Sequence, residues 1–250
     1  MDVIKSAIVN NEFIPFLQPL IESKSGKLVG CEVLLRWNYK NSVIIHPDEF
    51  ISFIENNAMI IEITKGIMYQ VECAFKDIAY KISESFTIGF NISAMHCNDM
   101  DIVNDCCFFL SAIESEYIHL NIEITERKYL QHTTVSQQVF KGLHDLGVTL
   151  SIDDFGTGYS NLIYLQDFNF DIIKIDKKFV KYVGINNTSD DIISCIVSLA
   201  EHLKLKTVAE GVETNIQADR MRELNVDYLQ GYLYGHPLPL NSFIDTWFYN

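Results

Sequence analysis

Short apolar runs alternate with longer helical stretches along the whole chain. The runs are rich in β-branched and aromatic residues, which is typical of strands, and helices between them indicate parallel strands joined by crossovers. Eight such runs occur, at Phe13–Pro19, Leu28–Trp37, Phe86–Asn91, His119–Glu123, Val148–Asp153, Asp171–Lys174, Leu205–Glu210 and Val226–Gln230. We therefore expect an α/β fold, a TIM-like (β/α)8 barrel, in a single domain over residues 1–250.

The first strand of this barrel is expected to be irregular. Only Leu20–Lys27 separates the first two runs, which is too short for a crossover helix, so this pair is expected to be antiparallel. Three helix starts are also visible. Pro47 is followed by two acids, Thr214 to Gln217 has the spacing of a capping box, and Ser189 is a candidate N-cap for Ile192–Leu203.

Polar side chains stand where the apolar runs end. They are Gln18, Glu32 with Arg36, Asn91, Glu123, Asp153 with Asp154, Lys174, Glu210 and Gln230. A single acid in such a place often caps the next helix. Because all eight runs end this way, and the strand ends of a barrel share one rim, the set indicates one active site.

The acids in this set predict a site for divalent cations. Five carboxylates would repel one another unless cations or protons neutralise them. Ligands that are all oxygen favour Mg²⁺ or Mn²⁺ over zinc, and two such ions form a clamp for displacement at phosphorus. Lys174 is expected to orient a water or to stabilise charge on a phosphate, with an ordinary salt bridge as the alternative. Arg36 shares a strand face with Glu32 and suits a phosphate, unless it is simply a surface arginine.

Composition limits the partners. With 33 acids against 19 bases the formal charge is −14, and no segment forms a basic face, which excludes duplex DNA or RNA bound through a phosphate-tracking patch. The N-terminus lacks a signal-peptide pattern, and no window has 18 uncharged apolar residues, so we expect no membrane segment and a cytoplasmic protein. The six cysteines lack C-x-x-C spacing and are expected to be reduced.

Taken in order, the motifs resemble those of the EAL domain of bacterial cyclic di-GMP phosphodiesterases. The matching segments are Asn11-Glu12-Phe13, Leu17-Gln18-Pro19, Glu32-Val33-Leu34-Leu35-Arg36-Trp37, Pro47-Asp48-Glu49-Phe50, Asn91-Ile92-Ser93, Glu123-Ile124-Thr125-Glu126, Asp153 to Ser160, Lys174-Ile175-Asp176, Glu210 to Thr214 and Gln230-Gly231-Tyr232. The resemblance implies a TIM-like barrel that cleaves one phosphodiester of cyclic di-GMP to linear pGpG with two Mg²⁺ or Mn²⁺ ions. It also implies that the enzyme lowers this second messenger and so affects biofilm and motility.

The resemblance also assigns roles to residues. Ligands of one metal are implied at Glu32, Asn91, Glu123 and Asp153, and Asp153 bridges to a second ion held by Asp154 and Glu210. The implied catalytic residues are Glu32, Lys174, which orients the water, and Glu210, which is either a ligand or the general base. The implied substrate contacts are Gln18, Leu35, Arg36, Asn91, Asp154, Glu213 and Gln230. Glu126 would anchor the loop at residues 154–160, which the family uses with a neighbouring helix in a homodimer.

A second hypothesis is a catalytically silent EAL-like receptor for cyclic di-GMP, or a regulator that binds a protein partner. Such relatives generally have replaced ligands, whereas this chain keeps the full set, which favours the active enzyme. Val33 stands in place of the signature alanine and is expected to point away from Glu32 and Arg36. Because the chain begins near the first helix of the barrel, we expect no sensor or cyclase domain.

Overall fold

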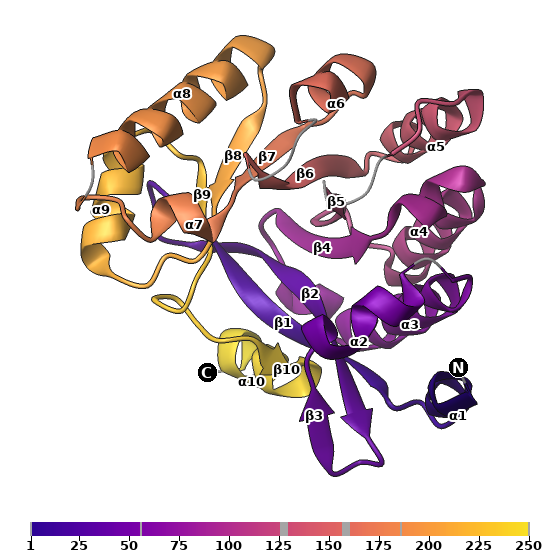
Figure 1. Ribbon diagram of the computed structural model, residues 1–250. Coiled ribbons are helices and arrows are strands. Elements are labelled where there is room, and N and C mark those ends of the chain that lie inside the picture. Colours follow the sequence, from indigo (N-terminus) through magenta and orange to yellow (C-terminus); the bar gives the residue numbers. More distant parts are fainter. Residues whose placement is uncertain (1, 56, 126–129, 157–160, 186, 250) are drawn as a thin grey trace.

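Eight strands close into a barrel with helices around its outside (Figure 1). The computed structural model describes residues 2–55, 57–125, 130–156, 161–185 and 187–249. The barrel strands are β1 (Phe13–Glu22), β2 (Leu28–Tyr39), β4 (Phe86–Ile92), β5 (Ile118–Thr125), β6 (Thr149–Phe155), β7 (Ile172–Ile175), β8 (Lys206–Ala209) and β9 (Tyr228–Leu229). Each of the eight strands expected from the sequence is present, with ends that agree to within three residues.

The barrel closes through its one reversed strand. β1 pairs with both β2 and β9, and both pairings are antiparallel, whereas β2, β4, β5, β6, β7, β8 and β9 follow one another in parallel. This confirms the expected TIM-like barrel with an antiparallel first strand. In register, Gln18 of β1 lies opposite Glu32 of β2, so the reversed strand brings a polar residue to the level of the site.

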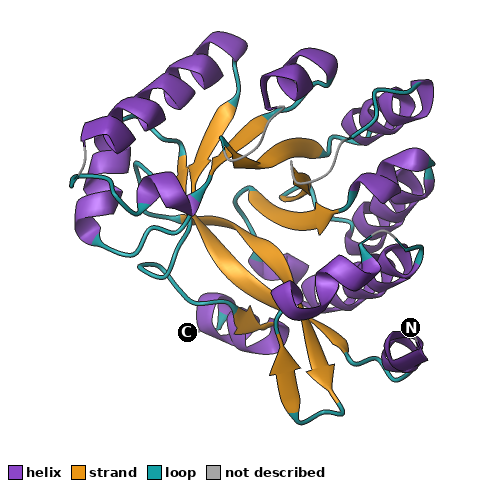
Figure 2. Cartoon of the chain, viewed as in Figure 1, coloured by secondary structure: helices purple, strands orange, loops and turns teal. Residues whose placement is uncertain are grey.

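Two short strands lie outside the barrel, and the sequence pattern did not reveal them. β3 (Val43–Ile45) pairs with the end of β2, and this hairpin projects from the barrel (Figure 2). β10 (Leu238–Pro239) pairs with β1. Segments of two or three residues are too short to show a period of two.

Helices cover the outer face of the barrel. They are α1 (Asp2–Val9), α2 (Pro47–Ile54), α3 (Met59–Ile78), η1 (Ala79–Lys81), η2 (Ala94–Asn98), α4 (Asp101–Ile113), α5 (Thr134–Asp145), α6 (Asn161–Asp167), α7 (Lys177–Val180), α8 (Asn187–Leu203), α9 (Asn215–Glu223) and α10 (Leu240–Phe248). Within the described residues, none of these is long and apolar enough to cross a membrane.

Two of the three expected helix starts are confirmed. α2 begins with Pro47 in its first turn, and α9 has the capping box, in which the Thr214 side chain accepts a hydrogen bond from the Gln217 N–H. Ser189 is not the N-cap of its helix, because α8 begins at Asn187 and Ser189 is buried inside it. The Asp190 carboxylate there accepts from the Arg220 guanidinium instead, at 2.8 Å.

The barrel strands are buried on both faces, with chemistry that alternates. Along β5, Leu120, Ile122 and Ile124 belong to the apolar core, whereas Asn121 and Glu123 are buried and hydrogen-bonded to side chains of the barrel interior. Apolar residues therefore pack against the helices and polar residues face the barrel axis. This period-two pattern gives the barrel a polar interior.

Candidate active site

Lys174 of β7 is the cation at the centre of the site. Its side chain is 3% exposed, and its Nζ lies 2.8 Å from Glu210 Oε1, 3.2 Å from Glu32 Oε2 and 3.6 Å from Asp153 Oδ1. The same Nζ donates to Glu123 Oε2. These carboxylates come from β2, β5, β6 and the end of β8, so one ammonium connects four parts of the barrel.

Glu32 is held on both of its oxygens. Oε1 accepts from the Asn91 amide at 2.6 Å, and Oε2 accepts from the Gln230 amide at 2.7 Å as well as from Lys174. Gln230 also donates to Gln18 Oε1 at 3.4 Å, and Gln18 donates to the Gly235 carbonyl at 3.2 Å. Buried Glu32 is therefore confined by partners from three other strands or strand ends.

Neutral side chains from earlier positions of β5 and β6 orient Glu123. Asn121, two residues earlier on the same face of β5, donates from Nδ2 to Glu123 Oε1 at 3.1 Å. The Asn121 Oδ1 accepts from Ser151 Oγ at 2.8 Å and from Thr149 Oγ1 at 3.1 Å. Gly89 of β4 leaves room for the carboxylate, because a Cβ at that position would overlap Glu123 Oε1.

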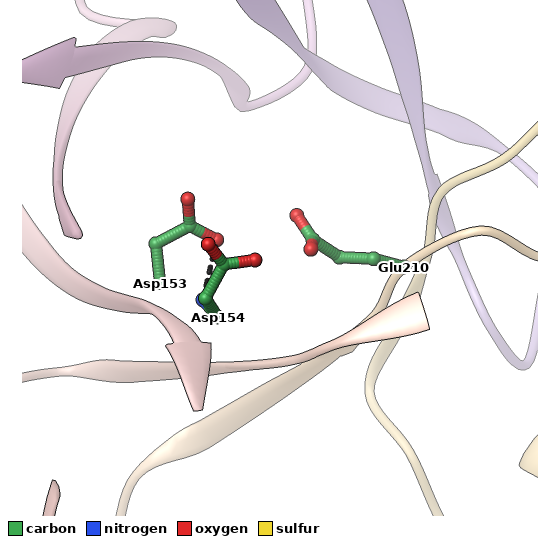
Figure 3. A group of neighbouring side chains, drawn as sticks. All are labelled: Asp153, Asp154 and Glu210. Carbon is green, nitrogen blue, oxygen red and sulfur yellow. Dashed lines mark hydrogen bonds between the residues drawn. The ribbon is translucent and has the colours of Figure 1, made fainter. Parts of the chain in front are cut away.

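Asp153, Asp154 and Glu210 form the outer part of the site (Figure 3). One carboxylate oxygen from each of the three residues lies within 4.8 Å of the other two. Asp154 has a left-handed backbone with φ of 56°, unusual for a residue other than glycine, and its N–H donates to Asp153 Oδ1 at 2.9 Å. The strained turn at the end of β6 thus brings two successive carboxylates to the same place.

The crowding of acids shifts their titration. Burial, together with Glu32 and Asp153, raises the pKa of Glu123 from 4.5 to about 8, and burial raises the pKa of Asp153 and of Glu210. Burial also acts on Glu32, but Lys174 and two amide donors outweigh it and lower its pKa. Burial opposes the charge of Lys174, yet the surrounding carboxylates outweigh it and raise its pKa. The cluster therefore has more acid than one ammonium neutralises.

The donor set fits divalent cations. Five carboxylates, of Glu32, Glu123, Asp153, Asp154 and Glu210, stand against Lys174, which leaves four negative charges when all are ionised. Carboxylates and the Asn91 amide supply oxygen ligands, which hard cations such as Mg²⁺ and Mn²⁺ prefer. Raised pKa values at three of the acids indicate that the site favours additional positive charge.

Other residues named from the sequence lie around this centre. Leu35 lines a cavity of about 300 Å³ beside Asn91, Asp153 and Asp154. Arg36 is 8% exposed, its guanidinium lies 5.5 Å from the Phe16 ring centroid, and it donates to the Leu35 carbonyl. Glu213 is exposed and lines a second cavity, outside the hydrogen-bonded network. Glu126 and loop residues 157–160 lie outside the described residues.

The structure adds residues that the sequence reasoning missed. Asn121 and Ser151 could have been found, because each stands two residues before an acid on the same strand face. Tyr232 and His236 stack at the rim, with ring centroids 4.0 Å apart. Asp176 caps α7 through the Lys178 N–H at 2.7 Å, which is the ordinary structural role of an acid after a strand.

The fold and site together define a barrel with an acidic rim whose donor set fits divalent cations, and comparison with known families agrees. The EAL domain family matches residues 1–237, so the chain belongs to the EAL domain family.

Characterised relatives and solved structures are similar along most of the chain. Cyclic di-GMP phosphodiesterase PdeL of Escherichia coli K12 is 39% identical over 98% of this chain and 68% of its own length. The probable cyclic di-GMP phosphodiesterase PdeG of the same organism is 38% identical over 95% of this chain and 47% of its own length. This chain thus spans about two thirds of the first relative and about half of the second.

Two solved structures share the fold over nearly their whole lengths. The PaMucR phosphodiesterase in complex with c-di-GMP has a TM-score of 0.83 and 30% identity, covering 97% of this chain and 98% of that one. An EAL domain protein of Listeria monocytogenes EGD-e has a TM-score of 0.81 and 30% identity, covering 98% and 96%.

Proposed function

We propose that this protein is a cyclic di-GMP phosphodiesterase that depends on divalent cations and produces linear pGpG. The observation that carries the proposal is the convergence of Glu32, Asn91, Glu123, Asp153 and Glu210 around Lys174 in a member of the EAL family. Relatives named for this activity support it. Turnover measured with each cation decides between Mg²⁺ and Mn²⁺.

The metal ligands are proposed in two groups. Glu32, Asn91, Glu123 and Asp153 would hold one ion, and Asp154 and Glu210 would hold a second, shared with Asp153. Bound divalent cations supply charge neutralisation at the phosphate and lower the pKa of a bound water. The clustering of the Asp153, Asp154 and Glu210 oxygens within 4.8 Å supports the second group.

The chain's own residues would orient the reacting groups. Lys174 keeps its proton among the carboxylates, so it is a permanent donor that can direct a water or a phosphate oxygen. Glu210 lies at 2.8 Å from Lys174 and inside the outer acid group, a position suited to ligation or to accepting a proton.

The remaining residues named from the sequence would contact the nucleotide. The set proposed for substrate binding is Gln18, Leu35, Arg36, Asn91, Asp154, Glu213 and Gln230. Arg36 makes no ion pair with any described residue, which leaves its guanidinium available for a phosphate. Leu35 lines a cavity that includes Asp153 and Asp154, and Glu213 lines another that includes Glu210, which suits a ligand with two nucleotide halves.

A homodimer through α6 and the loop before it is also proposed. Leu162 and Ile163 of α6 are 65% and 55% exposed, which is a high exposure for adjacent apolar side chains. Light scattering should give a molar mass of twice that of one chain, and the Leu162→Glu variant should have the mass of a single chain.

The function is tested by incubating the purified protein with cyclic di-GMP and either Mg²⁺ or Mn²⁺, with pGpG followed by chromatography. Glu32→Ala and Glu210→Gln should each abolish the product. The exposed acid variant Glu84→Gln, on the far side of the barrel from the rim, is the matched control and should retain activity. Binding of cyclic di-GMP without turnover under both metals would contradict the proposal and support the silent receptor.

A further inference from the structure

Lysines line the larger of the two cavities beside the acidic site. It has a volume of about 680 Å³, and Glu32, Glu210 and Gln230 lie along it. Its lining also includes all three lysines at and just after α7 (Lys177–Val180), which are Lys177, Lys178 and Lys181. We call these three residues the α7 lysines.

α7 packs against the two segments that follow the outer acids, after Asp154 and after Glu210. A Cβ on Gly156, two residues after Asp154, would lie 2.8 Å from Phe179 Cε2. A Cβ on Gly211, which follows Glu210, would lie 2.5 Å from Lys177 Cβ. Both glycines also have positive φ, of 95° and 68°, which other residues rarely adopt. The α7 lysines are therefore held next to Asp154 and Glu210 by the packing of the rim itself.

The charges of these lysines are not used within the protein. No described carboxylate forms an ion pair with any of the three, and all three are exposed. The Lys181 ammonium lies 5.6 Å from the Tyr182 ring centroid, and the other two have no such contact among the described residues. Three unpaired cations therefore line one cavity in a chain with a formal charge of −14.

The other cations near the site are already placed. Lys174 is enclosed by four carboxylates, and Arg36, which is proposed above to contact a phosphate, does not line this cavity. A cyclic dinucleotide has two phosphodiesters on opposite sides of its ring. When one lies at the acids and their cations, the second still carries a negative charge that an acidic protein must neutralise.

We propose that the α7 lysines bind the phosphate of the cyclic dinucleotide that is not cleaved, and so select a ligand with two phosphates over a simple phosphodiester. This inference rests on the proposed function. The lysines would lower KM for cyclic di-GMP. They would not contact the phosphate that reacts, which lies at the acidic residues and their cations.

The experiment compares two substrates in Mn²⁺. One is cyclic di-GMP and the other is bis(p-nitrophenyl) phosphate, which has a single phosphodiester. In the triple variant Lys177→Ala, Lys178→Ala, Lys181→Ala, the ratio of the two kcat/KM values should fall by about tenfold or more, mostly through KM for cyclic di-GMP. Raising the salt concentration should increase this KM more steeply in the wild type than in the variant.

A matched control and a binding measurement complete the test. Lys76→Ala removes an exposed lysine of α3 and should leave the ratio unchanged. Calorimetry with a non-hydrolysable phosphorothioate analogue should show affinity reduced by about tenfold in the triple variant.

The outcomes separate this inference from the proposed function. An unchanged ratio and affinity in the triple variant, or an equal loss on both substrates, would overturn the inference while wild-type turnover upholds the function. A wild type that binds the analogue without turnover would overturn the function, and the affinities would still decide the inference. A wild type that neither binds nor turns over would overturn both.

Discussion

Two levels of the barrel interior differ in their chemistry. The upper level holds the charged groups Glu32, Glu123, Asp153, Lys174 and Glu210, together with the Asn91 amide that donates to Glu32. The lower level lies beside a cavity of about 310 Å³ and contributes the neutral polar side chains of Thr87, Asn121, Thr149 and Ser151, and the charged residues Glu22, Asp171 and Lys206 also line this cavity. On β5 and β6 the two levels are two residues apart on the same strand face.

This difference shows how the barrel can hold so many acids. A buried charge is costly unless it is paired and hydrogen-bonded. The lower level supplies neutral donors, and Asn121 connects the levels, because its Nδ2 donates upward to Glu123 while its Oδ1 accepts from Ser151 and Thr149. The upper level is therefore poised for cations, and the lower level sets the orientation of its ligands.

The largest effect is expected from removing the cation of the upper level. Lys174→Met leaves four contacting carboxylates without their ammonium, and breaking a buried ion pair from one side costs about 3–5 kcal/mol of unfolding free energy. Denaturant titration of the metal-free protein measures this loss, and turnover should disappear as well.

The control for this prediction is an ion pair outside the barrel. Lys27 contacts Glu84 at 3.0 Å with a side chain that is 61% exposed, so Lys27→Met should cost about 0–1 kcal/mol. Equal losses for the two variants would contradict the special status of the upper level.

Filling the space beneath Glu123 should have the next largest effect. Gly89→Ala would push its Cβ into Glu123 Oε1, and such overpacking costs about 1–3 kcal/mol. We expect weaker Mn²⁺ binding together with a lower melting temperature. In contrast, nothing lies within 4 Å of a Cβ at Gly66 of α3, so Gly66→Ala should stabilise the protein by about 0.5–1 kcal/mol.

Changing the residue that joins the levels tests the comparison more finely. Asn121→Asp replaces the amide donor that faces Glu123 by an oxygen, so the carboxylate loses the group that orients it. Mn²⁺ affinity should fall by about 10- to 100-fold, as it does when other groups that support metal ligands are changed. Calorimetric titration measures it. Asn104→Asp makes the same charge change on exposed α4 and should leave the affinity unaltered. Equal affinities for wild type and Asn121→Asp would mean that the lower level does not orient Glu123.

The pH dependence gives the smallest effect. The pKa of Glu123 is raised to about 8, so the folded protein holds more protons than the unfolded chain between pH 4.5 and 8. Protonation of Glu123 therefore contributes to the free energy of unfolding of the metal-free protein at low pH, and this contribution is lost as the pH rises through that window. Metal binding must displace the proton, so Mn²⁺ affinity should rise by up to about tenfold per pH unit below 8 and then level off.

Melting curves with and without Mn²⁺ between pH 6 and 8.5 check this prediction. The stabilisation by metal should grow with pH, and Glu123→Gln should flatten that growth. A stabilisation by metal that falls with rising pH would contradict the assignment.

Sequence reasoning predicted the barrel and the charged upper level well. Strand identity is encoded locally, in the alternation of apolar and polar residues, and Glu123 and Asp153 stand at the ends of such patterns. The antiparallel β1 also followed from a local fact, the short connection before Leu28. Ser189 failed as an N-cap because a serine can also lie buried inside a helix, where only packing decides its place.

The sequence alone encodes the order of the strands, the direction of the first strand and the acid, amide or lysine near each strand end, because short-range periodicity and loop length are local properties. Three features depend on the tertiary structure. Lys174 contacts four of the carboxylates, Gly89 makes room for Glu123, and Gly156 and Gly211 allow α7 to pack closely beside Asp154 and Glu210. The physical reason is barrel closure. Closure fixes register and distance between strands that are far apart in the chain, and no local pattern contains either quantity.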